Sequence, residues 1–157
     1  MQLTLSFDEA LALATSRSPL PPVVRSIGCD DSTLFAELDL TELDTTSLRF
    51  RLAAIAAGPV SVTARLANFA DGVAHFALTV HARGLPAHKL LPMLLARVNT
   101  AIAESPAVAG ILSVEIVDDE PFALVALQSV VDERAPGFTI TALTLEHEEL
   151  FAVVRVG

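Results

Sequence analysis

The chain has 157 residues, of which 52% are hydrophobic and 18% charged, and this suits a single domain over 1–157 with a mainly aliphatic core. Nineteen acidic and ten basic residues give a formal charge of −9, which argues against nucleic acids and anionic lipid surfaces as partners. One cysteine, no basic leader and no apolar run of membrane-spanning length predict a cytoplasmic protein without membrane insertion.

The N-terminal segment predicts a short strand followed by a helix. Leucines alternate with polar residues over 1–5, which is typical of an edge strand. Ser6 and Glu9 have the spacing of a capping box and predict a helix over 7–16.

Residues 23–83 alternate between apolar and polar side chains and predict an up-and-down antiparallel meander of about five strands. Its first three predicted strands cover 23–27, 33–40 and 48–54. In the third strand, the pattern predicts inward-facing side chains for Leu48, Phe50 and Leu52.

The hairpin over 60–82 has the most specific pattern in the chain. A two-residue turn at Asp71 and Gly72 would mix polar and apolar side chains on each face, whereas a three-residue loop over 70–72 makes one face wholly apolar. This second register predicts the pairs Leu66 with Phe76, Ala64 with Leu78, Val62 with Val80 and Val60 with Ala82.

A helical pattern follows the hairpin. Apolar residues at helical spacing predict a long helix over 85–104, with Pro92 in the first turn of its main part. Alternation over 111–117 predicts the next strand.

The C-terminal segment allows two interpretations at its start. The acids and the proline over 118–121 predict a helix to about residue 134, whereas the valine-rich segment 122–131 also fits a strand. A hairpin over 138–145 and 150–156 closes the chain. The predicted fold is α+β: a curved antiparallel β-meander packed on the long helix, with a short N-terminal helix and a C-terminal helix plus β-hairpin.

No group of residues in the sequence has the spacing of a catalytic or metal site. His75 and His81 lie six residues apart on one strand, too far to share a metal, and neither His88 nor His147 adds a ligand motif. The acids beside Cys29 disfavour its thiolate. We therefore predict no catalytic residue, no metal and no cofactor.

The long helix facing the aliphatic sheet is the feature most suggestive of a function. A gap between them would form an apolar cavity for an acyl chain or another apolar ligand, whereas a helix that fills the sheet's concave face would leave none. The residues predicted to line the cavity are Phe76, Leu78, Val80, Leu91, Leu94, Leu95 and Val98.

The order of the elements, with the alternation over 60–82 and the helix over 86–104, resembles the tubular lipid-binding superfamily across most of the chain. In that superfamily a strongly curved sheet wraps a long helix and holds lipid. The resemblance is architectural, so it implies an apolar-ligand role and carries over no functional residue.

Two functions follow from these observations. The first is a non-enzymatic binding module for a hydrophobic small molecule or lipid, and the alternative is a structural or protein-interaction subunit that forms a homo-oligomer. A cavity walled by the long helix and the Phe76 face would favour the first function. A filled core with an exposed apolar helix or strand face would favour the second.

Overall fold

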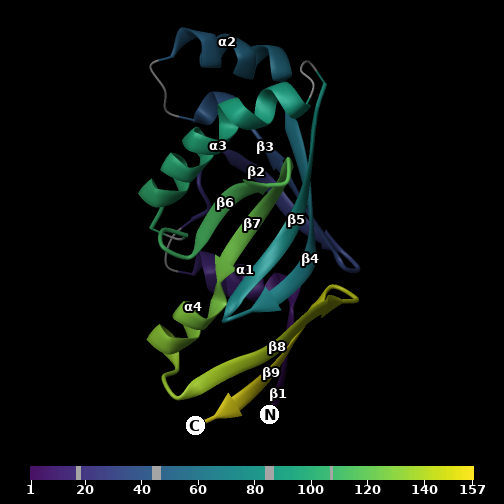
Figure 1. Ribbon diagram of the computed structural model, residues 1–157, viewed down its shortest axis with the longest axis vertical. Coiled ribbons are helices and arrows are strands. Elements are labelled where there is room, and N and C mark those ends of the chain that lie inside the picture. Colours follow the sequence, from purple (N-terminus) through teal and green to yellow (C-terminus); the bar gives the residue numbers. More distant parts are fainter. Residues whose placement is uncertain (17–18, 44–46, 84–86, 107) are drawn as a thin grey trace.

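The computed structural model describes residues 1–16, 19–43, 47–83, 87–106 and 108–157 (Figure 1). The strands are β1 (Gln2–Ser6), β2 (Val24–Asp30), β3 (Thr33–Leu38), β4 (Val60–Ala70), β5 (Val73–Ala82), β6 (Leu112–Val117), β7 (Glu120–Ala126), β8 (Phe138–Glu146) and β9 (Glu149–Val156). The helices are α1 (Phe7–Thr15), α2 (Leu48–Ala57), α3 (Ala87–Glu104) and α4 (Leu127–Arg134), with one 3-10 turn over Leu40–Glu42.

The strands form two antiparallel sheets. One has six strands in the order β2-β3-β4-β5-β7-β6, and the other has three in the order β1-β9-β8. Figure 1 shows α2 at one end of the molecule and the three-stranded sheet at the other. The predicted α+β class, with a meander packed on the long helix, is confirmed, and the closing hairpin belongs to the second sheet.

The N-terminal strand and helix form as predicted. β1 pairs with β9, and Ser6 Oγ accepts a hydrogen bond of 3.1 Å from the backbone N–H of Glu9. Ser6 is therefore the N-cap of α1 and satisfies one of the amide groups that the start of a helix leaves unpaired.

The register of β4 against β5 is confirmed, since all four predicted pairs occur: Leu66 with Phe76, Ala64 with Leu78, Val62 with Val80 and Val60 with Ala82. The apolar face that these pairs form packs against two separate hydrophobic cores. The helix-side core consists of the buried residues Leu40, Leu43, Phe50, Ala54, Ala57, Val60 and Leu94. The sheet-junction core consists of the buried residues Ala74, Phe76 and Leu143.

The predicted three-residue loop of this hairpin is wrong. Ala70 pairs with Val73, so the turn contains only Asp71 and Gly72, whose φ angles are +53° and +80°. A bulge at Ala67 adds one unpaired residue to β4 and shifts the pairing beyond it by one position. The bulge and the longer loop give the same register, which is why the pairs were predicted correctly from the wrong turn.

The strand predicted over 48–54 is also wrong, because these residues belong to α2. The Ser47 hydroxyl accepts a hydrogen bond of 3.3 Å from the backbone N–H of Phe50 and caps the helix. Leucine, arginine and alanine favour helix, and no β-branched residue occurs before Ile55. The meander therefore has four strands, with α2 between β3 and β4.

Of the three residues predicted to face inward in that segment, only Phe50 does so. Its side chain is 2% exposed, whereas Leu48 and Leu52 are 67% and 58% exposed. A helical period of 3.6 residues, in place of a strand period of two, puts Leu52 on the far side of the element from Phe50. Arg97 of α3 lies over the Phe50 ring, 4.5 Å from its centroid, and ties α2 to α3.

The segment predicted as a helix from residue 118 is divided between β7 and α4. The strand alternative is confirmed for β7 and the helix for α4. Asp118 and Asp119 have positive φ and form the turn between β6 and β7, so they cap no helix. Pro121 fits in this central strand because β5 pairs with β7 only from Phe122 onward, where every residue has an N–H to donate.

The long helix forms as predicted, although Pro92 lies inside α3 and not in its first turn. Proline there removes one hydrogen bond from the helix interior. Leu94 and Val98 pack in the helix-side core on the C-terminal side of the proline, and this burial offsets the loss. Residues 85 and 86 of the predicted helix lie outside the described residues.

The turn between β2 and β3 joins the two sheets at one side of the molecule. Asp31 Oδ1 accepts a hydrogen bond of 2.8 Å from the backbone N–H of His147, and the Asp31 carbonyl accepts one of 2.9 Å from the N–H of Glu148. The Glu148 carbonyl in turn accepts from the N–H of Phe7 at 2.9 Å. These bonds connect a turn of the six-stranded sheet to a turn of the three-stranded sheet and to the start of α1.

Gln128 at the start of α4 makes a second connection between the sheets. Its backbone N–H donates to the Gly72 carbonyl at 3.0 Å, and its side-chain amide bonds the carbonyl of Phe138 and the N–H of Ile140 in β8. A Cβ atom on Gly72 would lie 2.4 Å from the Gln128 Cβ, so this approach of turn and helix requires glycine.

The two sides of α2 should respond differently to truncation. We expect Phe50→Ala to lower the free energy of unfolding by about 3–5 kcal/mol, because it removes a ring from the helix-side core. Leu52→Ala should change it by less than about 0.5 kcal/mol, because that side chain is exposed. Denaturant unfolding of both variants measures the difference, and equal losses would contradict the helical assignment of α2.

Candidate functional site

The seven residues predicted to line one apolar cavity are divided between the two cores. Leu94 is buried in the helix-side core, and Val80 and Val98 pack against it. Phe76 is buried in the sheet-junction core, and Leu78 packs against it. Leu91 and Leu95 of α3 are half-buried and belong to neither core.

One hollow on the surface of the described residues lies where β4 passes β8. Its volume is about 270 Å³, and it sits beside the bulge at Ala67. The lining residues are Ser32, Arg65, Leu66, Ala67, Asn68, Phe69, Leu143, Thr144, Leu145 and Glu146. None of the seven predicted residues is among them, and the opposite charges of Arg65 and Glu146 select no simple anion or cation.

Another hollow has a volume of about 400 Å³ and lies on the opposite face of the β4–β5 hairpin from the cores. Glu37 pairs with Ser61 and Ser61 pairs with His81 in the register of β3, β4 and β5, so three polar side chains stand in one row. All three line the hollow. Within the described part of the chain, no hydrogen bond connects Ser61 to His81, so the row lacks the contact that activates a serine nucleophile.

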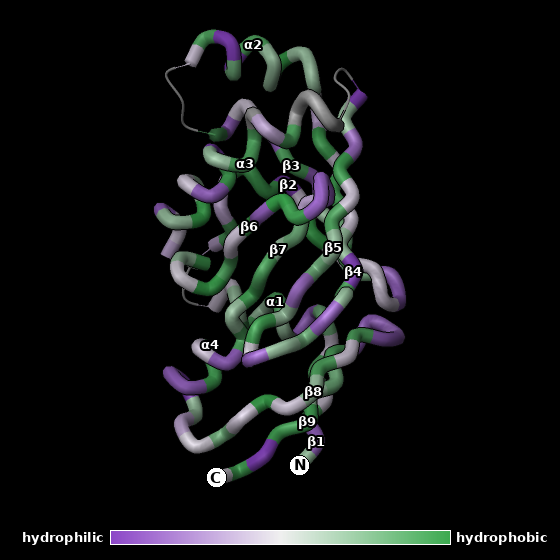
Figure 2. Tube along the Cα trace, in the orientation of Figure 1, coloured by the Kyte–Doolittle hydropathy of each residue, from purple (hydrophilic) through white to green (hydrophobic). Residues whose placement is uncertain are grey.

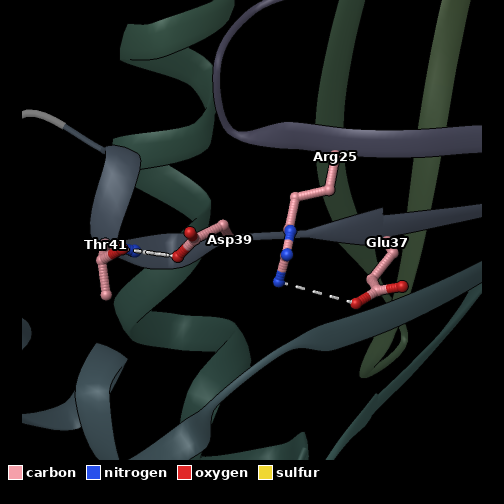
Figure 3. A network of polar contacts seen from close by, with 4 residues as sticks. All are labelled: Arg25, Glu37, Asp39 and Thr41. Atoms are coloured by element: carbon pink, nitrogen blue, oxygen red, sulfur yellow. Dashed lines mark hydrogen bonds and ion pairs between the residues drawn. The ribbon is translucent and has the colours of Figure 1, made fainter.

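The acidic end of this row is part of a polar network beside the hollow (Figure 3). The Glu37 carboxylate lies 3.9 Å from the guanidinium of Arg25. Nearby, Asp39 Oδ1 accepts hydrogen bonds from the hydroxyl and the backbone N–H of Thr41, and these hold the pKa of Asp39 below its usual value. Both partnerships have structural roles, since Asp39 caps the 3-10 turn and Arg25 crosses from β2 to β3.

The structure describes the side chains of three of the four histidines. His75 is half-buried in β5, His81 is exposed, and His147 Nδ1 lies 3.4 Å from Asp31 Oδ1. The side chain of His88 lies outside the described part. Among the residues described, no three His, Cys, Asp or Glu side chains gather closely enough to hold a metal ion.

The outward side of α2 carries the most exposed large aliphatic side chains that any helix presents among the described residues. Leu48, Leu52 and Ile55 are 67%, 58% and 68% exposed and follow one another at the i, i+4, i+7 spacing of one helix face. We call these three residues the α2 stripe. Sequence reasoning missed it because residues 48–54 alternate like a strand, although the helical spacing emerges once Ile55 is included.

Charge is distributed unevenly along the chain, and α2 lies in its basic part. Residues 47–103 contain six of the ten basic residues and only one of the nineteen acidic ones. Arg49 and Arg51 are the charged residues of α2, and both are exposed. Figure 2 shows strongly hydrophilic residues at the β2–β3 and β8–β9 turns, away from α2.

Comparisons with protein-family models, with curated proteins and with solved structures gave no match. No helix in the described ranges is both long and apolar enough to cross a membrane.

Cys29 should be a slow nucleophile at neutral pH. Burial raises the pKa of its thiol, and the carboxylates of Glu148, Asp30, Asp31 and Asp8 raise it further. We expect the rate of alkylation to rise with pH around a higher midpoint in the folded protein than in the urea-unfolded chain, because the thiolate is the reactive form.

Two variants separate the causes of this shift. Glu148→Gln should lower the midpoint of the folded protein, whereas Glu133→Gln on α4, which does not contribute to the shift, should leave it unchanged. A folded-state midpoint below the unfolded one would contradict this account.

Proposed function

We propose that this chain is a non-enzymatic protein-interaction subunit that forms a homo-oligomer, with the α2 stripe as a contact surface. The observation that carries the proposal is the exposure of Leu48, Leu52 and Ile55 on one face of a helix at the end of the molecule. Isolated exposed leucines are common, but a continuous apolar stripe favours a contact.

A second copy suits this surface because an antiparallel pair of α2 helices is complementary to itself. About a two-fold axis, Arg49 and Arg51 in the N-terminal half of one helix would lie beside the C-terminal half of the other. The C-terminal end of a helix carries a partial negative charge that attracts cations. Small residues in that half, Ala53 and Ala56, allow the two backbones to approach closely.

The size of the stripe sets the expected strength. A stable interface buries about 800 Å² on each partner, and three side chains on a ten-residue helix provide less than that. The α2 contact alone should therefore be weak and should depend on protein concentration.

Binding of a hydrophobic small molecule or lipid is the second candidate function. The observation in its favour is that three apolar side chains, those of Leu66, Phe69 and Leu143, are among the residues that line the hollow beside Ala67. Against it, five of the seven residues predicted to form a cavity pack in the two cores. Native mass spectrometry of freshly purified protein would favour this function by detecting a discrete extra mass that is lost on denaturation.

Self-association through α2 is tested by one charged substitution and a matched control. We expect Leu52→Glu to lower the weight-average mass at a given concentration, because it places a carboxylate in the centre of the stripe. Leu13→Glu introduces the same change at a 51% exposed leucine on α1 and should leave the mass unchanged. Sedimentation velocity over a range of concentrations measures both.

Two results would overturn the proposal. One is a wild-type protein that stays monomeric at every concentration. The other is an equal loss of association in both variants, since that would be a general effect of added negative charge on a chain with net charge −9.

A further inference from the structure

The two sheets have four edge strands, β2 and β6 in one and β1 and β8 in the other. An edge strand presents unpaired N–H and C=O groups that can pair with another chain, and proteins usually protect these groups. Among the residues that the structure describes, three of the four edges have such protection. β1 does not.

The edge of β6 is covered by a side chain from α3. Asn99 Nδ2 donates to the carbonyl of Val114 at 2.9 Å, and Asn99 Oδ1 accepts from the N–H of the same residue at 3.0 Å. The amide of Asn99 thus takes the place that a neighbouring strand would occupy.

The edges of β8 and β2 are protected in other ways. Gln128 covers β8 by bonding the Phe138 carbonyl and the Ile140 N–H, and a bulge follows directly after Ile140. In β2 a bulge interrupts the pairing between Val24 and Ser26, and it contains the charged side chain of Arg25. Bulges and charges are both recognised means of preventing edge pairing.

β1 has none of these features. Its sequence, QLTLS, contains no charged residue and no proline, and its pairing with β9 has no bulge over all five residues.

The hydrogen bonds at the two ends of β1 show which of its backbone groups face outward. Met1 exchanges two hydrogen bonds with Val154, and the Phe7 N–H donates to the Glu148 carbonyl. Because antiparallel pairs alternate, Leu3 and Leu5 also bond β9, whereas the N–H and C=O groups of Gln2 and Thr4 face the open edge.

We infer that β1 pairs with β1 of a second copy, antiparallel about a two-fold axis, so that two three-stranded sheets join into one of six strands. Gln2 of one copy would lie opposite Thr4 of the other, and each such pair exchanges two backbone hydrogen bonds. The axis passes between the two Leu3 residues, which face each other directly.

The side chains of β1 suit this pairing. Leu3 is 50% exposed and ends an apolar row that continues through Ala152 to Leu143. Leu3 of the second copy would cover it and extend the row across the axis. Gln2 and Thr4 lie on the other face as uncharged polar neighbours, so no like charges meet in the strand pair.

This contact is independent of the α2 contact, since β1 and α2 lie at opposite ends of the molecule (Figure 1). Two different two-fold contacts on one chain produce an assembly larger than a dimer, either a closed ring or an open row of copies. Removing either contact alone should leave a dimer.

The test uses a proline at the edge-facing position of β1. Thr4→Pro removes an N–H that points to the open edge and leaves the bonds from Leu3 and Leu5 to β9, so the fold is retained. Thr4→Val keeps the N–H and the branched shape and is the matched control. Unfolding curves with the same midpoint verify that both variants are folded.

Sedimentation velocity of four proteins gives the outcome: Leu52→Glu, the double variants Leu52→Glu with Thr4→Pro and Leu52→Glu with Thr4→Val, and Thr4→Pro alone. We expect Leu52→Glu alone and Leu52→Glu with Thr4→Val to dimerise with rising concentration. Leu52→Glu with Thr4→Pro should stay monomeric. Hydrogen exchange at Thr4 should slow as the Leu52→Glu variant dimerises.

A Leu52→Glu variant that is monomeric at every concentration would overturn the β1 pairing and leave the edge to an extended segment of another protein. Equal dimerisation of the two double variants would overturn it as well. If the Thr4→Pro single variant is monomeric, this result would contradict the proposed α2 contact but not the proposed β1 pairing. The two proposals therefore fail separately.

Discussion

The register between β4 and β5 is the constraint on which the rest of the structure depends. It places the apolar residues of two long strands on one face, and that face is long enough to pack against two cores. Val60 and Val80 contact the helices, whereas Leu66 and Phe76 contact the second sheet. A shift of one residue would turn this face toward solvent and remove both cores at once. The bulge at Ala67 maintains the alignment through a tight turn.

The packing of the cores also determines which surfaces remain for contacts with other molecules. Phe50 packs one side of α2 into the helix-side core, and the opposite side of this helix is exposed in the described part of the chain. The turn at Asp31 and the side chain of Gln128 attach the three-stranded sheet to the larger one. β8 is covered by this attachment and β1 is left as the outer strand. The two surfaces proposed for self-association are thus consequences of how the cores are filled.

The sequence was sufficient for the fold class and for the β4–β5 register, because only one alignment makes a face wholly apolar over eight positions. It failed for 48–54, where apolar and charged residues alternate as in a strand and the helical period appears only when the segment is extended to Ile55. The candidate cavity could not be judged from sequence, since whether Leu94 lines a gap or fills one depends on how closely α3 approaches the sheet. The sequence could not show that β1 is the uncovered edge. The edges of β6 and β8 are covered by hydrogen bonds from Asn99 and Gln128, which are distant in the sequence, and no local pattern indicates these bonds.

The most direct test of this account is the pattern of cross-strand nuclear Overhauser effects in the β4–β5 hairpin. The account predicts contacts between the backbones of Leu66 and Phe76 and of Val60 and Ala82, with Ala67 unpaired and a two-residue turn at Asp71 and Gly72. A regular ladder through Ala67 that pairs Leu66 with Ala77 would contradict it, because both cores would then lose the face on which they are built.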